Sequence, residues 1–146
     1  SGLGGRFFDE LRERQSLAYT VHAFASERRL AGAFGAYIAM SPDQEDVARA
    51  GLLAEFQKLR DAPVTAEELA HVQAYALGAH AIRQQRGSAV LDDVITAWID
   101  GRLAALDEFE DRVRAVTREQ IQSLAQRYFD PDRRVEGVVR GTGQTV

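Results

Sequence analysis

A helix followed directly by a strand is predicted by residues 4–25, GGRFFDELRERQSLAYTVHAFA. In the first half of this stretch, Phe7, Phe8 and Leu11 fall on one side of a helix, with charged residues between them. From residue 19 onward the side chains alternate with a period of two, which is typical of a strand. The stretch therefore predicts a helix over residues 5–15 and a strand over residues 19–25.

The remaining elements follow from their capping and breaking residues. Residues 31–40 predict a second strand, and the short charged turn before it favours an antiparallel hairpin. Ser41-Pro42 begins a helix that runs to about residue 60, and capping boxes at Thr65 and Thr117 begin two others. Beyond residue 60, helices are predicted over residues 65–85, 88–99, 103–116 and 117–130. A closing strand is predicted for Arg133–Arg140, and a loose tail for 141–146.

The order of these elements predicts an α+β fold, in which helices pack on one face of a mainly antiparallel sheet. The length suits a single domain over residues 1–146. Because Gly2-Leu3-Gly4-Gly5 runs straight into a helix pattern, we expect this domain to be a fragment of a longer protein. Three strands are few for an independent sheet, and we expect the parent protein to supply more. The core is expected to contain Phe8, Leu11, Leu53, Leu69, Leu77, Val94, Trp98, Ile121 and Leu124.

Composition excludes several classes of function. The net charge is −4, so no basic surface for nucleic acid is expected. The chain has no cysteine, which removes disulfides, zinc–thiolate sites and cysteine nucleophiles together. It has no run of 18 apolar residues, so no membrane span is expected. With 45% hydrophobic and 27% charged residues, the remaining expectation is an ordinary globular domain.

No metal site is predicted within this chain. Its three histidines are His22, His71 and His80, and none stands in the H-x-x-E-H or H-E-x-x-H spacing that holds zinc. Glu68 and His71 lie one turn apart, but a metal would need a second such pair. An exposed helix face is the expected role of that pair.

Residues 4–19 resemble the pattern G-x-x-S/G-R-L-F-x-E-L-R-E-x-x-G-L-A/G-Y, the signature of the C-terminal half-module in pitrilysin/insulinase-type zinc peptidases, including the mitochondrial-processing-peptidase group. Phe8 stands at a Leu/Phe position, and Ser16 replaces the usual small glycine. The resemblance continues over nearly the whole chain. It takes in residues 32–34, 37–38 and 41–43, then Leu59-x-x-x-Pro63-Val64-Thr65-x-Glu67-Glu68-Leu69 and Ala115-Val116-Thr117-x-Glu119-x-Ile121.

The resemblance implies the inactive, substrate-holding half of a zinc metallopeptidase. The family's arginine–tyrosine pair falls on Arg12 and Tyr19, which would support substrate binding and the transition state, with no catalytic residue in this segment. An arginine can hold a peptide carbonyl through several fixed donors, and a tyrosine hydroxyl can donate to an oxygen that gains negative charge. In the absence of this resemblance, a solvated helix arginine and a sheet aromatic would be the simpler roles.

The partners and setting are likewise implied by the resemblance. They are a peptide or protein substrate, a zinc-bearing catalytic half in the same gene or on a partner subunit, and, as a further option, a second copy in a homodimer. Zinc would lie in the partner half, with no cofactor in this chain. A bacterial periplasm or envelope is the setting that the family favours. The alternative is a scaffold domain of the same fold with no proteolytic role.

Overall fold

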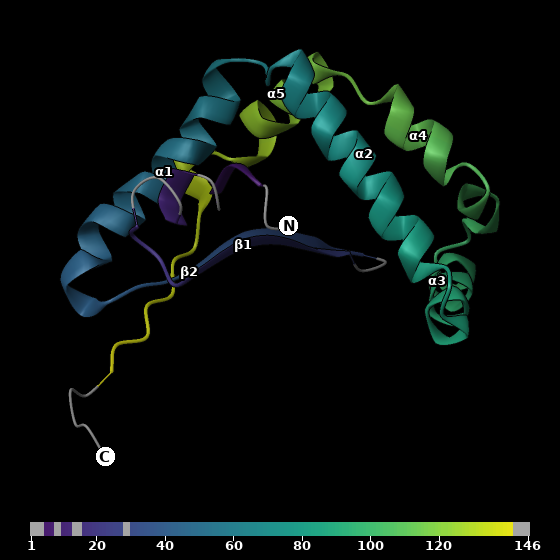
Figure 1. Cartoon of the computed structure of the whole chain (residues 1–146), viewed down its shortest axis with the longest axis horizontal. Coiled ribbons are helices and arrows are strands. Elements are labelled where there is room, and N and C mark those ends of the chain that lie inside the picture. Colours follow the sequence, from purple (N-terminus) through teal and green to yellow (C-terminus); the bar gives the residue numbers. More distant parts are fainter. Residues whose placement is uncertain (1–4, 8–9, 13–15, 28–29, 142–146) are drawn as a thin grey trace. The chain divides into compact units, whose positions relative to one another are not determined.

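The computed structural model describes residues 5–7, 10–12, 16–27 and 30–141 (Figure 1). Two strands, β1 (Thr20–Glu27) and β2 (Gly32–Ala39), pair in a two-stranded sheet. The helices that follow within these residues are α1 (Glu45–Asp61), α2 (Ala66–Arg83), α3 (Gly87–Ile99), α4 (Phe109–Ala115) and α5 (Arg118–Tyr128). Short 3-10 turns lie at Pro42–Gln44, Leu103–Leu106 and Pro131–Arg133. The fold is α+β, as the sequence predicts.

Both predicted capping boxes are confirmed. The Thr65 hydroxyl accepts from the backbone N–H of Glu68 at 3.1 Å, and the Glu68 carboxylate accepts from the backbone N–H of Thr65. Thr117 and Gln120 make the same reciprocal pair at the start of α5. Each pair satisfies two N–H groups that a helix start otherwise leaves without a partner, which is why α2 and α5 begin where they do.

Contacts divide the chain into two compact units, of which the first comprises Ser1–Phe24, Phe34–Ala62 and Ser123–Val146. Its core places one face of the hairpin against α1: Val21 and Ile38 from the strands meet Ala48 and Leu52 from the helix. On the opposite face, His22 lies beside Tyr37 and the Phe24 ring covers Gly35. A side chain at position 35 would overlap that ring, because a Cβ there would lie 2.6 Å from it.

Aromatic rings extend this core. Phe7, Phe34, Phe56 and Phe129 contact one another, with ring centroids 5.0 to 6.1 Å apart. The end of α1 is also joined to the segment after α5, because Arg60 donates to the carbonyl of Phe129 at 2.9 Å. Chain segments that are distant in sequence are thereby fixed together within the first unit.

The second unit comprises Ala25–Ala33 and Pro63–Gln122. Within it, the side-chain amide of Gln73 on α2 donates to the carbonyl of Val113 on α4 at 3.0 Å. The imidazole of His80 stacks on the ring of Phe109, with centroids 4.0 Å apart. A hydrogen bond and a stacking contact therefore join α2 to α4.

The predicted closing strand is wrong for this chain. Residues Arg133–Arg140 form no strand in the described structure, where β1 and β2 pair only with each other. A strand needs a backbone partner, and none of the described segments runs alongside to supply one. Ion pairs to α1 hold the segment instead.

The predicted core is correct only in part. Leu11 is fully buried, and Leu53, Leu69, Leu77 and Ile121 are half-buried, whereas Phe8 lies outside the described residues. Val94, Trp98 and Leu124 are exposed, so their predicted burial is wrong.

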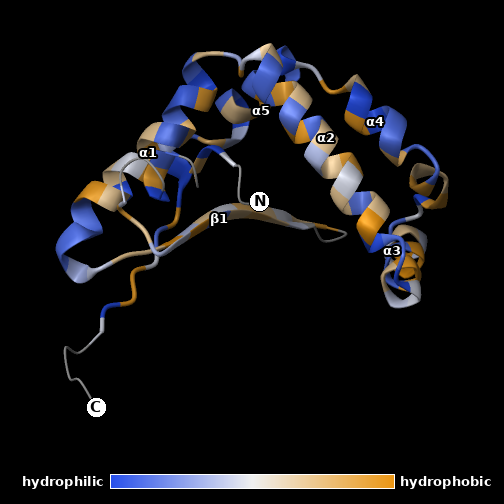
Figure 2. Ribbon diagram, viewed as in Figure 1, coloured by the Kyte–Doolittle hydropathy of each residue, from blue (hydrophilic) through white to orange (hydrophobic). Residues whose placement is uncertain are grey.

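The exposure of Val94 and Trp98 has a physical cause in α3. This helix packs through its small and polar side, where Ala89 is buried and the Asp93 carboxylate pairs with Arg83 and Gln84 at the end of α2. Its large apolar residues lie on the other side, and Trp98 is 70% exposed. Figure 2 shows α3 as an apolar element of the chain. In α5, Ala125 is buried instead of its neighbour Leu124.

Two further expectations concern the ends and the membrane. Gly141 is exposed, and the rest of the predicted tail, residues 142–146, lies outside the described residues. None of the helices in the described part of the chain combines the length and apolar character needed to cross a bilayer.

Candidate functional site

Ser16 closes a backbone turn between the two predicted site residues. Ser16 has a φ of 50°, the left-handed conformation that usually ends a helix, and its N–H donates to the carbonyl of Arg12 at 3.1 Å. The N–H of Leu17 reaches back to the carbonyl of Leu11 at 2.8 Å. These nested bonds explain why a glycine is usual at position 16, because only glycine adopts this conformation without steric cost.

The turn is anchored by buried apolar residues next to each site residue. Leu11, Leu17 and Ala18 belong to the core of the first unit, and Leu11 has no exposed surface. Arg12 and Tyr19 adjoin these anchors in sequence and are themselves exposed, Tyr19 to 72%. The backbone N–H of Tyr19 donates to the carbonyl of Ala39 at 2.8 Å, which fixes it at the start of the hairpin.

Both predicted residues are therefore exposed next to buried anchors of the first unit. A guanidinium and a phenol in this setting can donate hydrogen bonds to carbonyl oxygens of a peptide. A site on elements that packing holds in place meets a ligand without first becoming ordered. Substrate binding by Arg12 and Tyr19 stays a prediction.

Zinc does not fit the residues that the structure describes. In that part of the chain, no group of three or more histidine, aspartate or glutamate side chains is placed to hold a metal ion. His22 lies between aromatic rings of the hairpin, His80 is stacked on Phe109, and His71 is exposed on α2.

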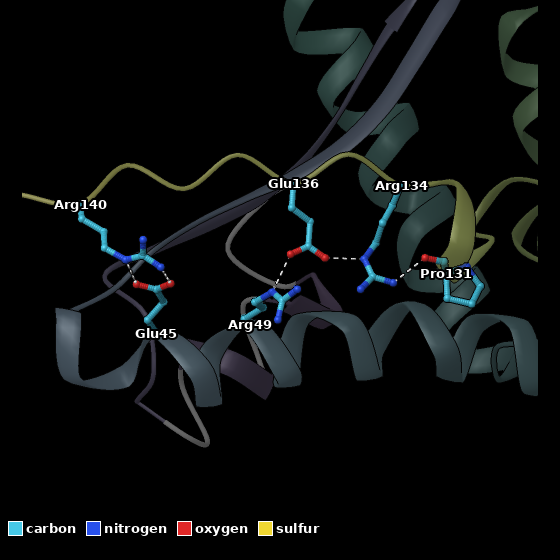
Figure 3. Close-up of polar contacts among 6 residues, drawn as sticks. All are labelled: Glu45, Arg49, Pro131, Arg134, Glu136 and Arg140. Carbon is cyan, nitrogen blue, oxygen red and sulfur yellow. Dashed lines mark hydrogen bonds and ion pairs between the residues drawn. The ribbon is translucent and has the colours of Figure 1, made fainter.

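A set of ion pairs, here called the clamp, holds the segment Arg134–Arg140 on α1 (Figure 3). Arg140 makes two parallel bonds to Glu45, at 2.6 and 2.8 Å. Glu136 accepts from Arg49 at 2.6 Å and also from Arg134. Sequence reasoning missed the clamp because its partners on α1 and on the segment are 87 and 95 residues apart, and no local pattern signals such pairs.

The clamp changes the titration of its carboxylates. The hydrogen bond from Arg49, followed by that from Arg134, lowers the pKa of Glu136 to about 2. The hydrogen bond from Arg140 lowers the pKa of Glu45. Glu136 is exposed and Glu45 is half-buried at the surface, so solvent screens these pairs, and their role is to position the segment more than to stabilise the fold.

Comparison with solved structures shows the fold. An inactive domain of peptidase M16 from Pseudomonas fluorescens matches with a TM-score of 0.77 at 17% identity, over 90% of this chain and 32% of that one. A protease from Helicobacter pylori matches with a TM-score of 0.77 at 17% identity, over 88% of this chain and 32% of that one. An inactive peptidase domain from Bordetella parapertussis matches with a TM-score of 0.77 at 24% identity, over 94% of this chain and 75% of that one. At these identities the likeness is one of fold.

The sequence comparison gives the family. A profile of the peptidase M16 inactive domain matches residues 1–75, so the chain belongs to the peptidase M16 inactive-domain family. An uncharacterised zinc protease of Streptomyces coelicolor is 27% identical over 139 residues, which cover 85% of this chain and 27% of that protein. The chain thus spans about a quarter of the length of that relative.

Proposed function

We propose that this chain is the non-catalytic half of a zinc metalloendopeptidase, a single domain of a longer two-half enzyme. It binds extended peptide substrate and completes the cleft opposite the zinc-bearing half, which lies in the same polypeptide or on a partner subunit. Membership of an inactive-domain family supports the absence of its own catalysis. The observation that carries the proposal is that Arg12 and Tyr19 are exposed on backbone fixed by the buried Leu11 and Ala18.

The two side chains have different roles in this proposal. Arg12 holds a carbonyl of the bound peptide through its permanently charged guanidinium, in the ground state and the transition state alike. The Tyr19 hydroxyl donates a hydrogen bond to the oxygen of the carbonyl under attack. Negative charge develops on that oxygen, so the hydrogen bond is strongest in the transition state. The zinc ion and the attacking water belong to the partner half.

Kinetics of the assembled, zinc-containing enzyme on a quenched peptide test these roles. Tyr19→Phe is expected to lower kcat and kcat/KM together by about 10²–10³, the typical effect of removing one such donor. Arg12→Ala is expected chiefly to raise KM. Tyr75→Phe, at an exposed tyrosine on α2, and Arg112→Ala, on α4, are the matched controls and should leave both constants unchanged.

Urea melts of the same variants separate function from packing. All four should unfold within about 0.5 kcal/mol of the wild type, as is usual for surface substitutions. Unchanged kinetics in both Arg12→Ala and Tyr19→Phe would contradict the proposal and favour the scaffold alternative. A large loss of stability in either variant would assign that residue to packing.

A further inference from the structure

The face of the hairpin that is turned away from α1 carries aromatic side chains. Val21 and Ile38 point into the core, so the residues that alternate with them along each strand belong to the other face. His22 and Phe24 on β1 and Tyr37 on β2 are among these residues. The solvent-facing side of an antiparallel sheet is normally polar. This one instead presents three rings, and Phe24 and Tyr37 are 47% and 51% exposed.

These three rings form a continuous row. The ring centroids of His22 and Tyr37 are 5.2 Å apart, and those of His22 and Phe24 are 6.3 Å apart. Both distances lie in the range of favourable aromatic contacts. The row of His22, Phe24 and Tyr37 is here called the aromatic shelf. All three residues belong to the first unit, as does Tyr19.

Gly35 allows the shelf to lie close to the sheet. The Phe24 ring lies across this glycine, where a Cβ would stand 2.6 Å from the ring. Only a residue without a side chain lets a ring approach the backbone of β2 this closely. The end of the ring therefore rests against β2, while about half of Phe24 stays exposed to a ligand.

The absence of charge on these strands indicates which ligand suits the shelf. Residues 20–24 of β1 and 34–39 of β2 include no aspartate, glutamate, lysine or arginine, although 27% of the chain is charged. A charged side chain would meet no ion-pair partner on these strands and would lose hydration on contact. An aromatic or large aliphatic side chain avoids that loss and gains both burial and ring contacts. The chemistry of this face therefore favours an uncharged, apolar side chain.

We propose that the aromatic shelf binds an apolar side chain of the peptide substrate and so determines which peptides the enzyme prefers. The shelf is continuous with the candidate site, because Tyr19 directly precedes the strand that carries His22 and Phe24. A strand advances about 3.3 Å per residue, so these two residues lie about 10–17 Å along the chain from Tyr19. A peptide extended along β1 would place the selected side chain about three to five residues from the carbonyl that Tyr19 contacts. This inference rests on the proposed function and adds to it the class of side chain that the substrate carries.

Aromatic side-chain NMR of the isotopically labelled chain tests the shelf without any hydrolysis. The probes are the capped peptide acetyl-Ser-Gly-Ser-Phe-Ser-Gly-Ser-amide and the same peptide with alanine, arginine or glutamate in place of phenylalanine. With the phenylalanine peptide we expect saturable shifts of the ring signals of His22, Phe24 and Tyr37. Its affinity should exceed that of the other three peptides by roughly threefold or more. Because the readout needs no zinc-bearing half, its failure is distinct from failure of the kinetic roles of Arg12 and Tyr19.

Matched variants assign the binding to the shelf. Tyr37→Ser removes one ring of the shelf, whereas Tyr75→Ser removes a tyrosine of α2 that is equally exposed, at 51%. Tyr37→Ser should weaken binding of the phenylalanine peptide about three- to tenfold, and Tyr75→Ser should leave it unchanged. Gly35→Ala keeps all three rings but displaces that of Phe24, so it should weaken binding as well. Amide spectra check that each variant keeps the fold, and the probe series in the wild type depends on no variant.

Several outcomes would overturn the proposal. They include the absence of saturable ring shifts, equal binding of the alanine peptide, and binding that survives unchanged in both Tyr37→Ser and Gly35→Ala. Stronger binding of the arginine peptide would also overturn it, because the rings would then recognise a cation through their π faces. Ring shifts that grow with protein concentration in the absence of peptide would do the same, because a second copy of the chain would then occupy the face.

Discussion

Ser16 is the residue on which the geometry of the candidate site depends. It holds a positive φ where a side chain other than that of glycine is strained, and the bonds to Arg12 and Leu11 close around it. The resemblance identified glycine as usual at this position, and the structure supplies the reason. The residues on either side of the turn are fixed in place because Leu11 and Leu17 are buried together.

Replacing Ser16 by glycine should therefore stabilise the protein. Left-handed backbone costs a non-glycine residue about 1–2 kcal/mol, which glycine would relieve. Part of this relief is offset because glycine gives the unfolded chain greater conformational freedom. The expected net gain in the free energy of unfolding is about 0.5–1 kcal/mol, measured by urea melts. Ser16→Val should lose stability instead. A loss in Ser16→Gly would show that the serine side chain has a contact that outweighs the strain.

Gly51 and Gly78 form a matched pair that tests the core. Both lie in helices, but a Cβ at position 51 would stand 2.8 Å from Leu11, whereas a Cβ at position 78 meets nothing within 4 Å. Gly51→Ala should destabilise by about 1–3 kcal/mol, the usual effect of overpacking. Gly78→Ala should stabilise by about 0.5–1 kcal/mol through helix propensity. Thermal or urea melts measure both variants. An equal gain in the free energy of unfolding for Gly51→Ala and Gly78→Ala would mean that the Leu11 side chain can move aside.

At the scale of the element, the start of α2 depends on its capping box. Thr65→Ala removes the acceptor for the Glu68 N–H and should cost about 1 kcal/mol. Thr65→Ser keeps an equivalent hydroxyl and is the control, expected within about 0.5 kcal/mol of the wild type. Urea melts measure both. A neutral Thr65→Ala would indicate that packing alone sets the start of α2.

The segment on α1 should detach in acid. The pKa of Glu136 falls from 4.5 to about 2 on folding, so its pairing with Arg49 and Arg134 is complete above about pH 4.5 and is lost as the pH falls toward 2. Backbone NMR relaxation should show increased motion of residues 134–140 relative to α1 over this window. Glu136→Gln should show the increased motion already at neutral pH. A wild-type profile that is flat between pH 4.5 and 2 would contradict this role of the clamp.

Local signals in the sequence predict the elements well, and non-local pairing accounts for the failures. Thr65 and Thr117 predict the starts of their helices because each capping box lies within four consecutive residues. The valines before Arg140 suggest a strand, but strand formation depends on a neighbouring backbone that the described chain does not offer. The clamp is likewise invisible in sequence, since its charges meet only after folding.

At the scale of the whole molecule, family resemblance predicted the site residues, whereas the exposed apolar surface of α3 is visible only in the structure. Composition and spacing alone would have left Arg12 and Tyr19 as ordinary surface residues. Conversely, the apolar pattern of α3 predicts burial of Trp98, whereas its small side packs and the tryptophan is exposed. An apolar surface of this kind is typical of a domain that contacts further protein.

The exposure of Trp98 is itself testable. Because its indole is 70% exposed, Trp98→Gln should change the free energy of unfolding by less than about 1 kcal/mol, far below the 3–5 kcal/mol that truncation of a buried aromatic residue costs. The chain has one tryptophan, so fluorescence quenching by iodide in the wild type provides a second readout. Strong protection from iodide would mean that another molecule, or another part of the chain, covers α3.

The most direct test of the central claim is hydrolysis of a quenched peptide by the zinc-bearing half alone, by this chain alone and by both together. We predict zinc, by elemental analysis, only in the partner half. Addition of this chain should raise kcat/KM by roughly 10²-fold or more, the typical effect of one transition-state donor, and the rise should vanish with Tyr19→Phe. Stoichiometric zinc in this chain, or full activity of the partner without it, would contradict the account.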